Sequence, residues 1–301
     1  MKAEAICSAC ILHDLVGAMD TLGIEGEARG RILTRSFEFL ANTFDMRRVP
    51  SYYITSVHRI LKEETRIELP FAEARARCNE IGVAVARAVA AAAAGMGEEA
   101  RFGFLVRWAI AGNRLDFRTV GTGYGLDLSQ VGKLLNACVE EGLARDETEA
   151  IVARVRPGAK VLFIHDNVGE IALDALLLSE IRARGGTVTA ALRGGPITSD
   201  ATLEDGLAVG IDKAAHRVIV AGPDTLGISW EEMTPELRDA LTTADLVVAK
   251  GQANYYVLSE HRAEIPGEVA CLLTTKCDTV SRQFGCRTPA NLAVLLPASG
   301  A

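Results

Sequence analysis

The second half of the chain alternates short apolar runs with longer stretches of helical periodicity. The apolar runs are typical of buried strands, and turn-forming residues separate them from the helical stretches. Because a helix between successive strands implies a right-handed crossover, this alternation predicts a parallel, doubly wound sheet. The predicted strands cover residues 161–164, 187–192, 217–221, 246–249, 269–274 and 292–296, and the predicted helices cover 169–183, 201–215, 235–241, a short segment after Gly251, and 276–284.

The first half of the chain, from about residue 4 to residue 145, has the apolar spacing of helices and little strand signal. The composition changes at Pro157–Gly158, where the strand pattern begins. We therefore expect a helical N-terminal region over residues 1–156 and an α/β domain over residues 157–301. The predicted fold class is α/β with a helical N-terminal part.

The composition is that of a globular protein. The chain has 301 residues, of which 49% are hydrophobic and 24% charged, and its formal net charge is −7. An acidic chain lacks the basic surface typical of nucleic-acid-binding proteins, so we expect no nucleic-acid partner. The alanine-rich run at residues 89–94 is too short to span a membrane, and no secretory signal is visible. The seven cysteines have no scaffold-like spacing, which favours a reducing, cytoplasmic environment.

Polar side chains follow several of the predicted strands at their carboxyl ends. Asp166 and Asn167 follow the first strand, Asp200 closes the segment after the second, and Lys250 and residues 274–277 follow the fourth and fifth. Because parallel strands end at one edge of a sheet, we expect these side chains to lie together. Carboxylate and amide oxygens are ligands that hard divalent cations prefer. The sequence therefore predicts a magnesium-like ion held by Asp166, Asn167 and Asp200, with Lys250 neutralising a phosphate.

Each of these residues also has an ordinary structural interpretation. Asp166 or Asn167 can cap the following helix, Asp200 can cap the next helix, and Lys250 can be an exposed lysine. Their convergence on one edge favours a site. Other chemistries have no matching motif, since no Gly-x-Gly-x-x-Gly follows a strand and neither a Walker lysine motif nor a Gly-x-Ser-x-Gly elbow occurs.

Two cysteines near the N-terminus have the spacing of a zinc or redox pair. The segment is Cys7-Ser-Ala-Cys10, with His13 close by. No second Cys-x-x-Cys occurs, so a bound metal and ordinary half-buried thiols both stay open.

At these residues the sequence resembles the metal-dependent damage-control phosphatases, also called domain of unknown function 89. The resemblance is to the archaeal-type branch, which carries an N-terminal Cys-x-x-Cys. It implies a helical N-terminal region packed on a Rossmann-like, mostly parallel doubly wound sheet. The matching segments are Cys7–Cys10, residues 111–116, 166–170, 193–200 with Glu204 and Asp205, and 250–254.

The resemblance also implies roles for individual residues. Asp166, Asn167 and Asp200 match the metal ligands of the family. Lys250 and the backbone near Gly251 match phosphate-binding groups. The remaining matched residues are expected to bind or support the substrate and its phosphate: Asn113, Asp116, Glu170, Arg193 and Asn254. One departure is Tyr256, which stands where the family often carries a glutamate.

The function that we expect is therefore metal-dependent hydrolysis of small phosphate monoesters, such as sugar phosphates or damaged phosphometabolites. The expected cofactor is a divalent ion (Mg, Mn, Co or Ni), and the expected partner is a small phosphorylated metabolite. Tyr256 and the thiol pair leave a second hypothesis, a phosphometabolite-binding or metal-sensing protein with little catalysis. A carboxyl methyltransferase ranks below both because no glycine-rich adenosylmethionine loop is evident. Whether the chain forms a homo-oligomer stays open.

Overall fold

A seven-stranded sheet forms the centre of the computed structural model, which describes residues 1–119, 123–124 and 130–297. The strand order is β3-β9-β8-β7-β4-β5-β6. The prediction of a mostly parallel, doubly wound sheet is confirmed, because β4 to β8 all run parallel to their neighbours in that group. The strands are β3 Arg145–Asp146, β4 Lys160–Ile164, β5 Thr187–Leu192, β6 Arg217–Val220, β7 Leu246–Lys250, β8 Glu268–Thr274 and β9 Asn291–Leu296.

All six predicted strands occur, but the last one runs antiparallel to its neighbour β8. Thr274, at the end of β8, pairs with Asn291, at the start of β9. The connection between them therefore leaves and returns at the same edge of the sheet, so β9 comes back in the opposite direction. Strand β3, which was not predicted, pairs with the outer side of β9. The pairing involves only two residues of β3, too few to give a periodic pattern in the sequence.

The first half is helical as predicted, apart from three two-residue strands among the described residues. Besides β3, these are β1 Arg118–Thr119 and β2 Gly123–Tyr124, which pair with each other. The helices are α1 Ala5–Thr21, α2 Gly26–Thr43, α3 Pro50–Thr65, α4 Ala72–Ala93, α5 Glu98–Ala111, η1 Gly112–Leu115, α6 Val131–Glu141 and α7 Thr148–Val152.

The second half contains the predicted crossover helices, one of them divided. The helix predicted over residues 201–215 is split by Gly210, whose φ of 86° ends α9 and starts α10. Thr234 caps α11, since its side chain accepts a hydrogen bond from the Leu237 N–H. The helices are α8 Glu170–Ala183, α9 Leu203–Val209, α10 Ile211–Ala214, α11 Pro235–Thr243, α12 Gly251–Glu260, η2 Arg262–Glu264 and α13 Asp278–Gln283.

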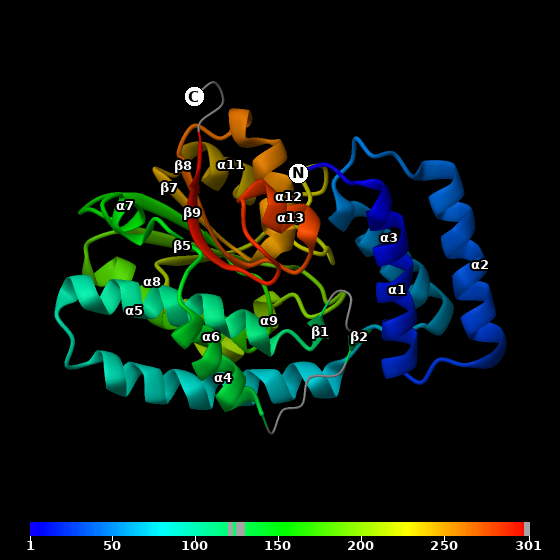
Figure 1. Ribbon diagram of the computed structural model, residues 1–301, viewed down its shortest axis with the longest axis horizontal. Helices are drawn as coiled ribbons and strands as arrows, with labels where there is room; N and C mark the ends of the chain where they lie inside the picture. The colour runs from blue at the N-terminus through cyan, green and yellow to red at the C-terminus, as the bar shows by residue number, and fades with distance from the viewer. Residues whose placement is uncertain (120–122, 125–129, 298–301) are drawn as a thin grey trace.

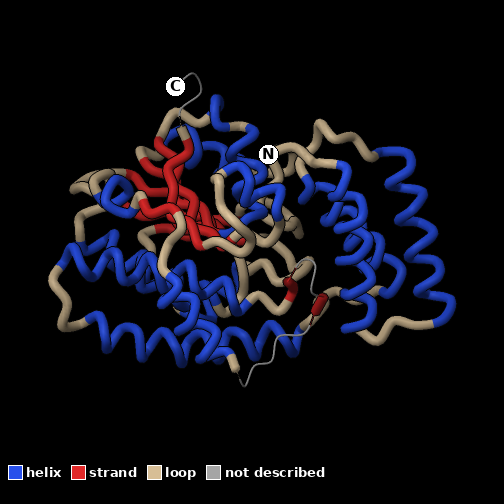
Figure 2. Tube along the Cα trace, viewed as in Figure 1, coloured by secondary structure: helices blue, strands red, loops and turns tan. Residues whose placement is uncertain are grey.

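Helices cover both faces of the sheet (Figure 2). Side chains alternate along β4, so that Val161 and Phe163 join the core under α5 and α8, whereas Leu162 and Ile164 join the core under α11 and α12. Helices α1 to α3 lie together beside the sheet (Figure 1). The first core also contains residues of these helices, so it joins residues on both sides of Pro157–Gly158, and the division there remains a prediction. Among the described residues, no helix is long and apolar enough to cross a membrane.

Helix α4 packs directly on the loop that follows β4. A Cβ atom added at Gly82 of α4 would lie 2.1 Å from the carbonyl oxygen of Gly169. Gly169 has a φ of 76°, a backbone conformation that L side chains rarely adopt. Two glycines therefore allow the backbones of α4 and of this loop to touch.

We expect Gly82→Ala to lower the free energy of unfolding by about 1–3 kcal/mol, because the added methyl group cannot fit without a backbone shift. Gly30→Ala is the matched control, since Gly30 lies on the exposed face of α2 with nothing within 4 Å of the added atom. That control should gain about 0.4–1 kcal/mol. Urea denaturation measures both, and equal stability of the two variants would contradict this packing.

Candidate active site

The loops after β4 and β5 meet at the carboxyl edge of the sheet. Asn167 and Asp200 form a backbone bridge, and the Ala201 N–H donates to the Asp166 carbonyl oxygen at 2.7 Å. The Asn167 side-chain amide donates to Asp166 Oδ2 at 2.7 Å, and Ser199 Oγ donates to Asn167 Oδ1 at 2.8 Å. The three residues predicted as metal ligands are thus brought to one place.

Asn113 reaches the same place from the helical half. It lies in η1, directly after α5, and its side-chain amide donates to Asp166 Oδ2 and to Glu170 Oε2, both at 3.2 Å. Asn167 also donates to Glu170 Oε2 at 3.1 Å. Two amides therefore lie between two buried carboxylates, which hold them in a fixed orientation.

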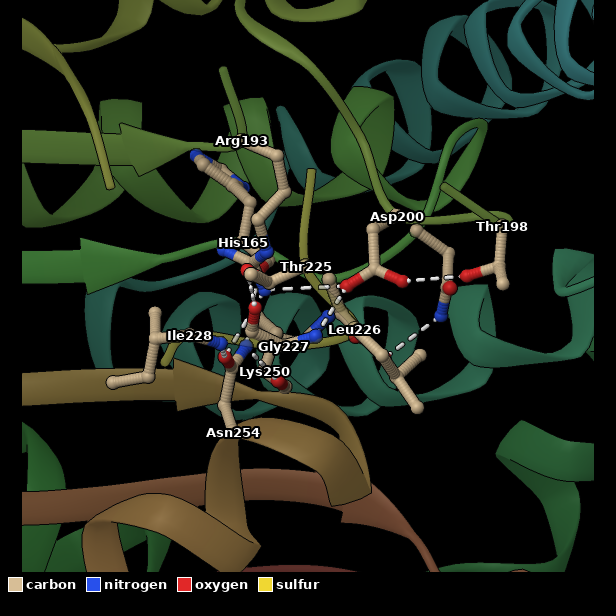
Figure 3. Close-up of polar contacts among 12 residues, drawn as sticks. His165, Arg193, Thr198, Asp200, Thr225, Leu226, Gly227, Ile228, Lys250 and Asn254 are labelled. Carbon is tan, nitrogen blue, oxygen red and sulfur yellow. Dashed lines mark hydrogen bonds and ion pairs between the residues drawn. The ribbon is translucent and has the colours of Figure 1, made fainter. Parts of the chain in front are cut away.

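Asp200 is fully buried, and hydrogen bonds fix both of its carboxylate oxygens (Figure 3). Its Oδ1 accepts from the Gly227 N–H at 2.7 Å and from Arg193 Nη2 at 3.3 Å. Its Oδ2 accepts from Thr198 Oγ1 at 2.9 Å. Asp200 is therefore oriented by the loops on either side of it, which is the condition a metal ligand needs.

The buried carboxylates outnumber the nearby cations among the described residues. Burial raises the pKa of Asp166 well above its usual range, and the charges of Glu170 and Asp200 raise it further. Burial likewise raises the pKa of Glu170, in spite of the adjacent Lys250 ammonium. The carboxylates are Asp116, Asp166, Glu170, Asp174 and Asp200, and the cations that pair with them are Lys250, Lys276 and Arg193. Arg118 and Asp14, which pair with each other beside the site, add one charge of each sign, so that six carboxylates face four cations; with every carboxylate ionised this leaves an excess of two negative charges, which one divalent cation would balance.

Gly251 makes room for the Asp166 carboxylate. A Cβ atom at Gly251 would lie 1.8 Å from Asp166 Oδ2, and the glycine has a φ of 75°. Any other residue would occupy the space that this carboxylate fills. The carboxylates of Asp166 and Asp200 and the side-chain amide of Asn167 are donor types that a hard divalent ion prefers.

Lys250 lies beneath the site and is fully buried, so the alternative of an exposed lysine is wrong. Its ammonium donates to the Ala109 carbonyl oxygen at 2.8 Å and to Asp174 Oδ1 at 2.7 Å, and it forms an ion pair with Glu170. Burial alone would lower the pKa of Lys250, but the charges of Asp174 and Glu170 outweigh it and raise the pKa. Lys250 therefore stays charged as the counter-ion of two carboxylates.

Hydrogen bonds from Arg193 and Asn254 connect the carboxyl ends of β4 and β7 (Figure 3). Arg193 Nη2 donates to Asn254 Oδ1 at 3.0 Å and to the His165 carbonyl oxygen at 3.3 Å. The Asn254 amide donates to the carbonyl oxygens of His165 at 3.0 Å and of Lys250 at 2.8 Å. The His165 side chain contacts α8, where its Nδ1 lies 2.9 Å from Asp174 Oδ2.

A small cavity of about 30 Å³ opens on Asp166 and Asn167. It has room for one or two water molecules, which is less than a sugar phosphate needs. Two cations line it that the sequence analysis left without a role, Lys276 and Arg118. The other lining residues are Ile54, Asp116, Leu226, Gln252, Ala253 and Tyr256.

Lys276 pairs with Asp116, and its N–H donates to Gln252 Oε1 at 2.8 Å. Burial alone would lower the pKa of Lys276, but the charges of Asp116 and Asp166 raise it. Its position after β8, at the same sheet edge as Asp166, was the signal that could have identified it. Arg118 had no comparable signal, because it lies in a two-residue strand.

The thiols of Cys7 and Cys10 are free and half-buried. Burial raises the pKa of both thiols. Over the described ranges, no group of three or more His, Cys, Asp or Glu side chains is arranged to hold a metal ion. The predicted set of Asp166, Asn167 and Asp200 contains only two such side chains, because its third member is an amide.

The family model for the damage-control phosphatase ARMT1-like domain matches residues 4–292 of the chain. The chain belongs to this family. It is 34% identical over 287 residues to a damage-control phosphatase of Archaeoglobus fulgidus, covering 95% of this chain and 96% of that protein. A damage-control phosphatase of Pyrococcus horikoshii is 27% identical over 285 residues, covering 94% of each chain.

A crystal structure of a DUF89 family protein from P. horikoshii has the same fold. It superposes with a TM-score of 0.86 at 25% sequence identity and covers 99% of this chain and 100% of that one. The family resemblance seen in the sequence is thus confirmed, together with the fold that it implied.

The buried carboxylates predict how the stability of the metal-free protein depends on pH. Because the folded-state pKa of Asp166 lies above the usual value of an aspartate, about 3.9, the folded chain binds this proton more tightly than the unfolded chain does. The melting temperature of the chelator-treated protein should therefore fall as the pH rises from about 4 toward the raised pKa.

We expect Asp166→Asn to make this decline shallower, because the substituted side chain no longer releases a proton. Asp212→Asn, at an exposed position of α10, is the control and should leave the decline unchanged. Melting curves at several pH values measure it, and an equally steep decline in Asp166→Asn would contradict the assigned pKa direction.

Proposed function

We propose that the protein is a metal-dependent phosphatase that hydrolyses small phosphate monoesters, such as sugar phosphates or damaged phosphometabolites. The observation that carries the proposal is the excess of buried carboxylates over their paired cations around Asp166, beside a cavity lined by Lys276. Membership of a damage-control phosphatase family supports it.

In this proposal Asp166, Asn167 and Asp200 hold the divalent ion. Bound there, Mg, Mn, Co or Ni would supply Lewis-acid polarisation of a phosphoryl oxygen. Asp166 is either a ligand that orients an attacking water or itself the nucleophile, and both options stay open. The amides of Asn113 and Asn167 hold the Asp166 carboxylate in place during either reaction, and Glu170 orients both amides.

Lys276 is the better candidate for the cation that binds the phosphoryl group. An ammonium has three donors, and the three donors of Lys250 meet Ala109, Asp174 and Glu170. We therefore propose that Lys250 acts through Glu170, which in turn orients both amides, and that Lys276 stabilises the developing charge. Asp116 positions Lys276 through their ion pair.

The remaining matched residues have supporting roles in this proposal. Arg193 and Asn254 hold the loop that carries Asp200, and Gly251 leaves the space for Asp166. We further propose that the chain belongs to the archaeal-type branch with Cys7 and Cys10, and that it works in the cytoplasm, where its seven free thiols stay reduced. Assembly into a homo-oligomer remains a hypothesis.

A second candidate is a phosphometabolite-binding protein with little catalysis. Tyr256 favours it, because this bulky side chain lines a cavity of only about 30 Å³. That candidate requires ligand binding without turnover.

We expect chelator-treated protein to release no phosphate from p-nitrophenyl phosphate or a panel of sugar phosphates, and to release it once Mg, Mn, Co or Ni is added. Asp166→Ala should lose this release and keep its fold, whereas the exposed control Asp212→Ala should keep full activity. Full activity in Asp166→Ala would refute the site, and metal binding without any release would favour the binding protein.

Two lysine variants separate the proposed roles of the buried cations. Lys276→Met should lower kcat/KM by about 10²–10³-fold, because it removes a charge that faces the cavity, and it should cost less stability than Lys250→Met, because only one carboxylate, Asp116, loses its counter-ion. Lys250→Met should lower the free energy of unfolding by about 3–5 kcal/mol, because Glu170 and Asp174 lose their counter-ion. Kinetics and urea denaturation distinguish them. If instead Lys250→Met mainly lowered kcat/KM and Lys276→Met mainly lowered stability, Lys250 would be the phosphate-binding lysine.

A further inference from the structure

Arg118 is a second cation on the wall of the cavity, and helices α1 and α3 determine its position. It lies in β1 and is 4% exposed. Its Nε donates to Asp14 Oδ1 of α1 at 2.6 Å. His58 Nε2, from α3, lies 2.8 Å from the other carboxylate oxygen of Asp14. Each oxygen of Asp14 thus has its own partner, which fixes the carboxylate against Arg118.

The same guanidinium extends toward the proposed metal ligands. Arg118 Nη1 donates to Thr198 Oγ1 at 3.4 Å, and Thr198 Oγ1 donates to Asp200 Oδ2 at 2.9 Å. The Arg118 N–H donates to Asp116 Oδ1 at 2.9 Å, and Asp116 pairs with Lys276. Arg118 is therefore connected to both sides of the site, the side of Asp200 and the side of Lys276.

The buried pair of Asp14 and Arg118 needs an explanation other than stability. Burial alone would raise the pKa of Asp14, but the Arg118 charge and the His58 hydrogen bond outweigh burial and lower it, so the carboxylate stays charged. A buried ion pair adds little stability relative to apolar residues of similar size. Arg75 is a buried arginine with a structural role for comparison. Its guanidinium donates to two backbone carbonyl oxygens and pairs with Asp205, and it is not among the residues lining this cavity.

A guanidinium is well suited to binding a phosphate group in this cavity. Its planar fork binds the oxygens of a phosphate with paired, charge-assisted hydrogen bonds, which the point charge of an ammonium cannot do. Lys276 already supplies an ammonium to the same cavity.

We propose that Arg118 contacts the phosphate group of the substrate, and that Asp14 and His58 position it for this contact. The inference rests on the proposed phosphatase function and extends it to helices α1 and α3. These helices thereby take part in recognising the substrate anion.

The test measures binding of inorganic phosphate by isothermal titration calorimetry in the presence of saturating Mn²⁺. Arg118→Met should bind phosphate about 10- to 100-fold more weakly and keep the Mn²⁺ affinity of the unaltered protein. Arg118→Lys should be weakened several-fold, because it keeps the charge and loses the fork. Arg101→Met is the control, since Arg101 pairs with Glu180 and is not among the residues lining the cavity, and it should bind phosphate normally.

Asp14→Asn tests the positioning role. With any phosphate monoester that the protein hydrolyses, it should raise KM more than it lowers kcat, whereas a purely structural loss would reduce the active fraction and leave KM unchanged.

Phosphate affinity of Arg118→Met equal to that of the unaltered protein would overturn the proposal, and so would a failure of the unaltered protein to bind phosphate at all. If Arg118→Met does not fold, Arg118→Lys decides, and unchanged phosphate affinity in that variant overturns the proposal. Phosphate binding that depends on Arg118 without any turnover would uphold this inference and refute the phosphatase function, so the two can fail separately.

Discussion

The site depends on one buried interaction, the ion pairs that Lys250 makes with Glu170 and Asp174. Lys250 ends β7, the two carboxylates lie one turn apart on α8, and the Ala109 carbonyl oxygen near the end of α5 accepts the third hydrogen bond. A strand and two helices are therefore joined at a single ammonium. Without it, the charge on Glu170 would have no counter-ion in the interior, and Glu170 would no longer be fixed as an acceptor for the amides of Asn113 and Asn167.

The same arrangement shows why this edge of the sheet is suited to chemistry rather than to stability. Asp166 and Glu170 are held close together although both are buried, which is costly for two negative charges. Glycines at positions 82, 169 and 251 allow the backbone and side chains to approach that closely. This concentration of buried negative charge supports the proposal of a bound cation, and the residues that create it come from both halves of the chain.

The sequence was sufficient to predict the sheet and the edge at which the candidate site residues meet, because both follow from strand periodicity and from the parallel order of β4, β5, β7 and β8. It was not sufficient to tell which lysine faces the cavity. Lys250 shares the face of Leu246 and Val248, which lies under α5 and α8, and its acidic partners follow four residues apart on a helix. Only the packing of α8 on β7 shows that these groups meet.

Other features lay outside what periodicity can show. The pairing of β3 with β9, and of β1 with β2, involves two residues per strand. Arg118 is positioned by Asp14, which His58 holds in turn, and these two residues are 104 and 60 positions away in the chain. Contacts of that range arise from tertiary packing and leave no local pattern.

The most direct test of the account is an equilibrium titration of chelator-treated protein with Mn²⁺ that counts both the ions bound and the protons released. The account predicts one ion per chain and a release of protons that grows as the pH is lowered toward the raised pKa values of Asp166 and Glu170, because cation binding lowers both pKa values. Both signals should disappear in Asp166→Asn. No binding, or binding that Asp166→Asn leaves unchanged, would contradict the claim that this buried negative charge is a metal site.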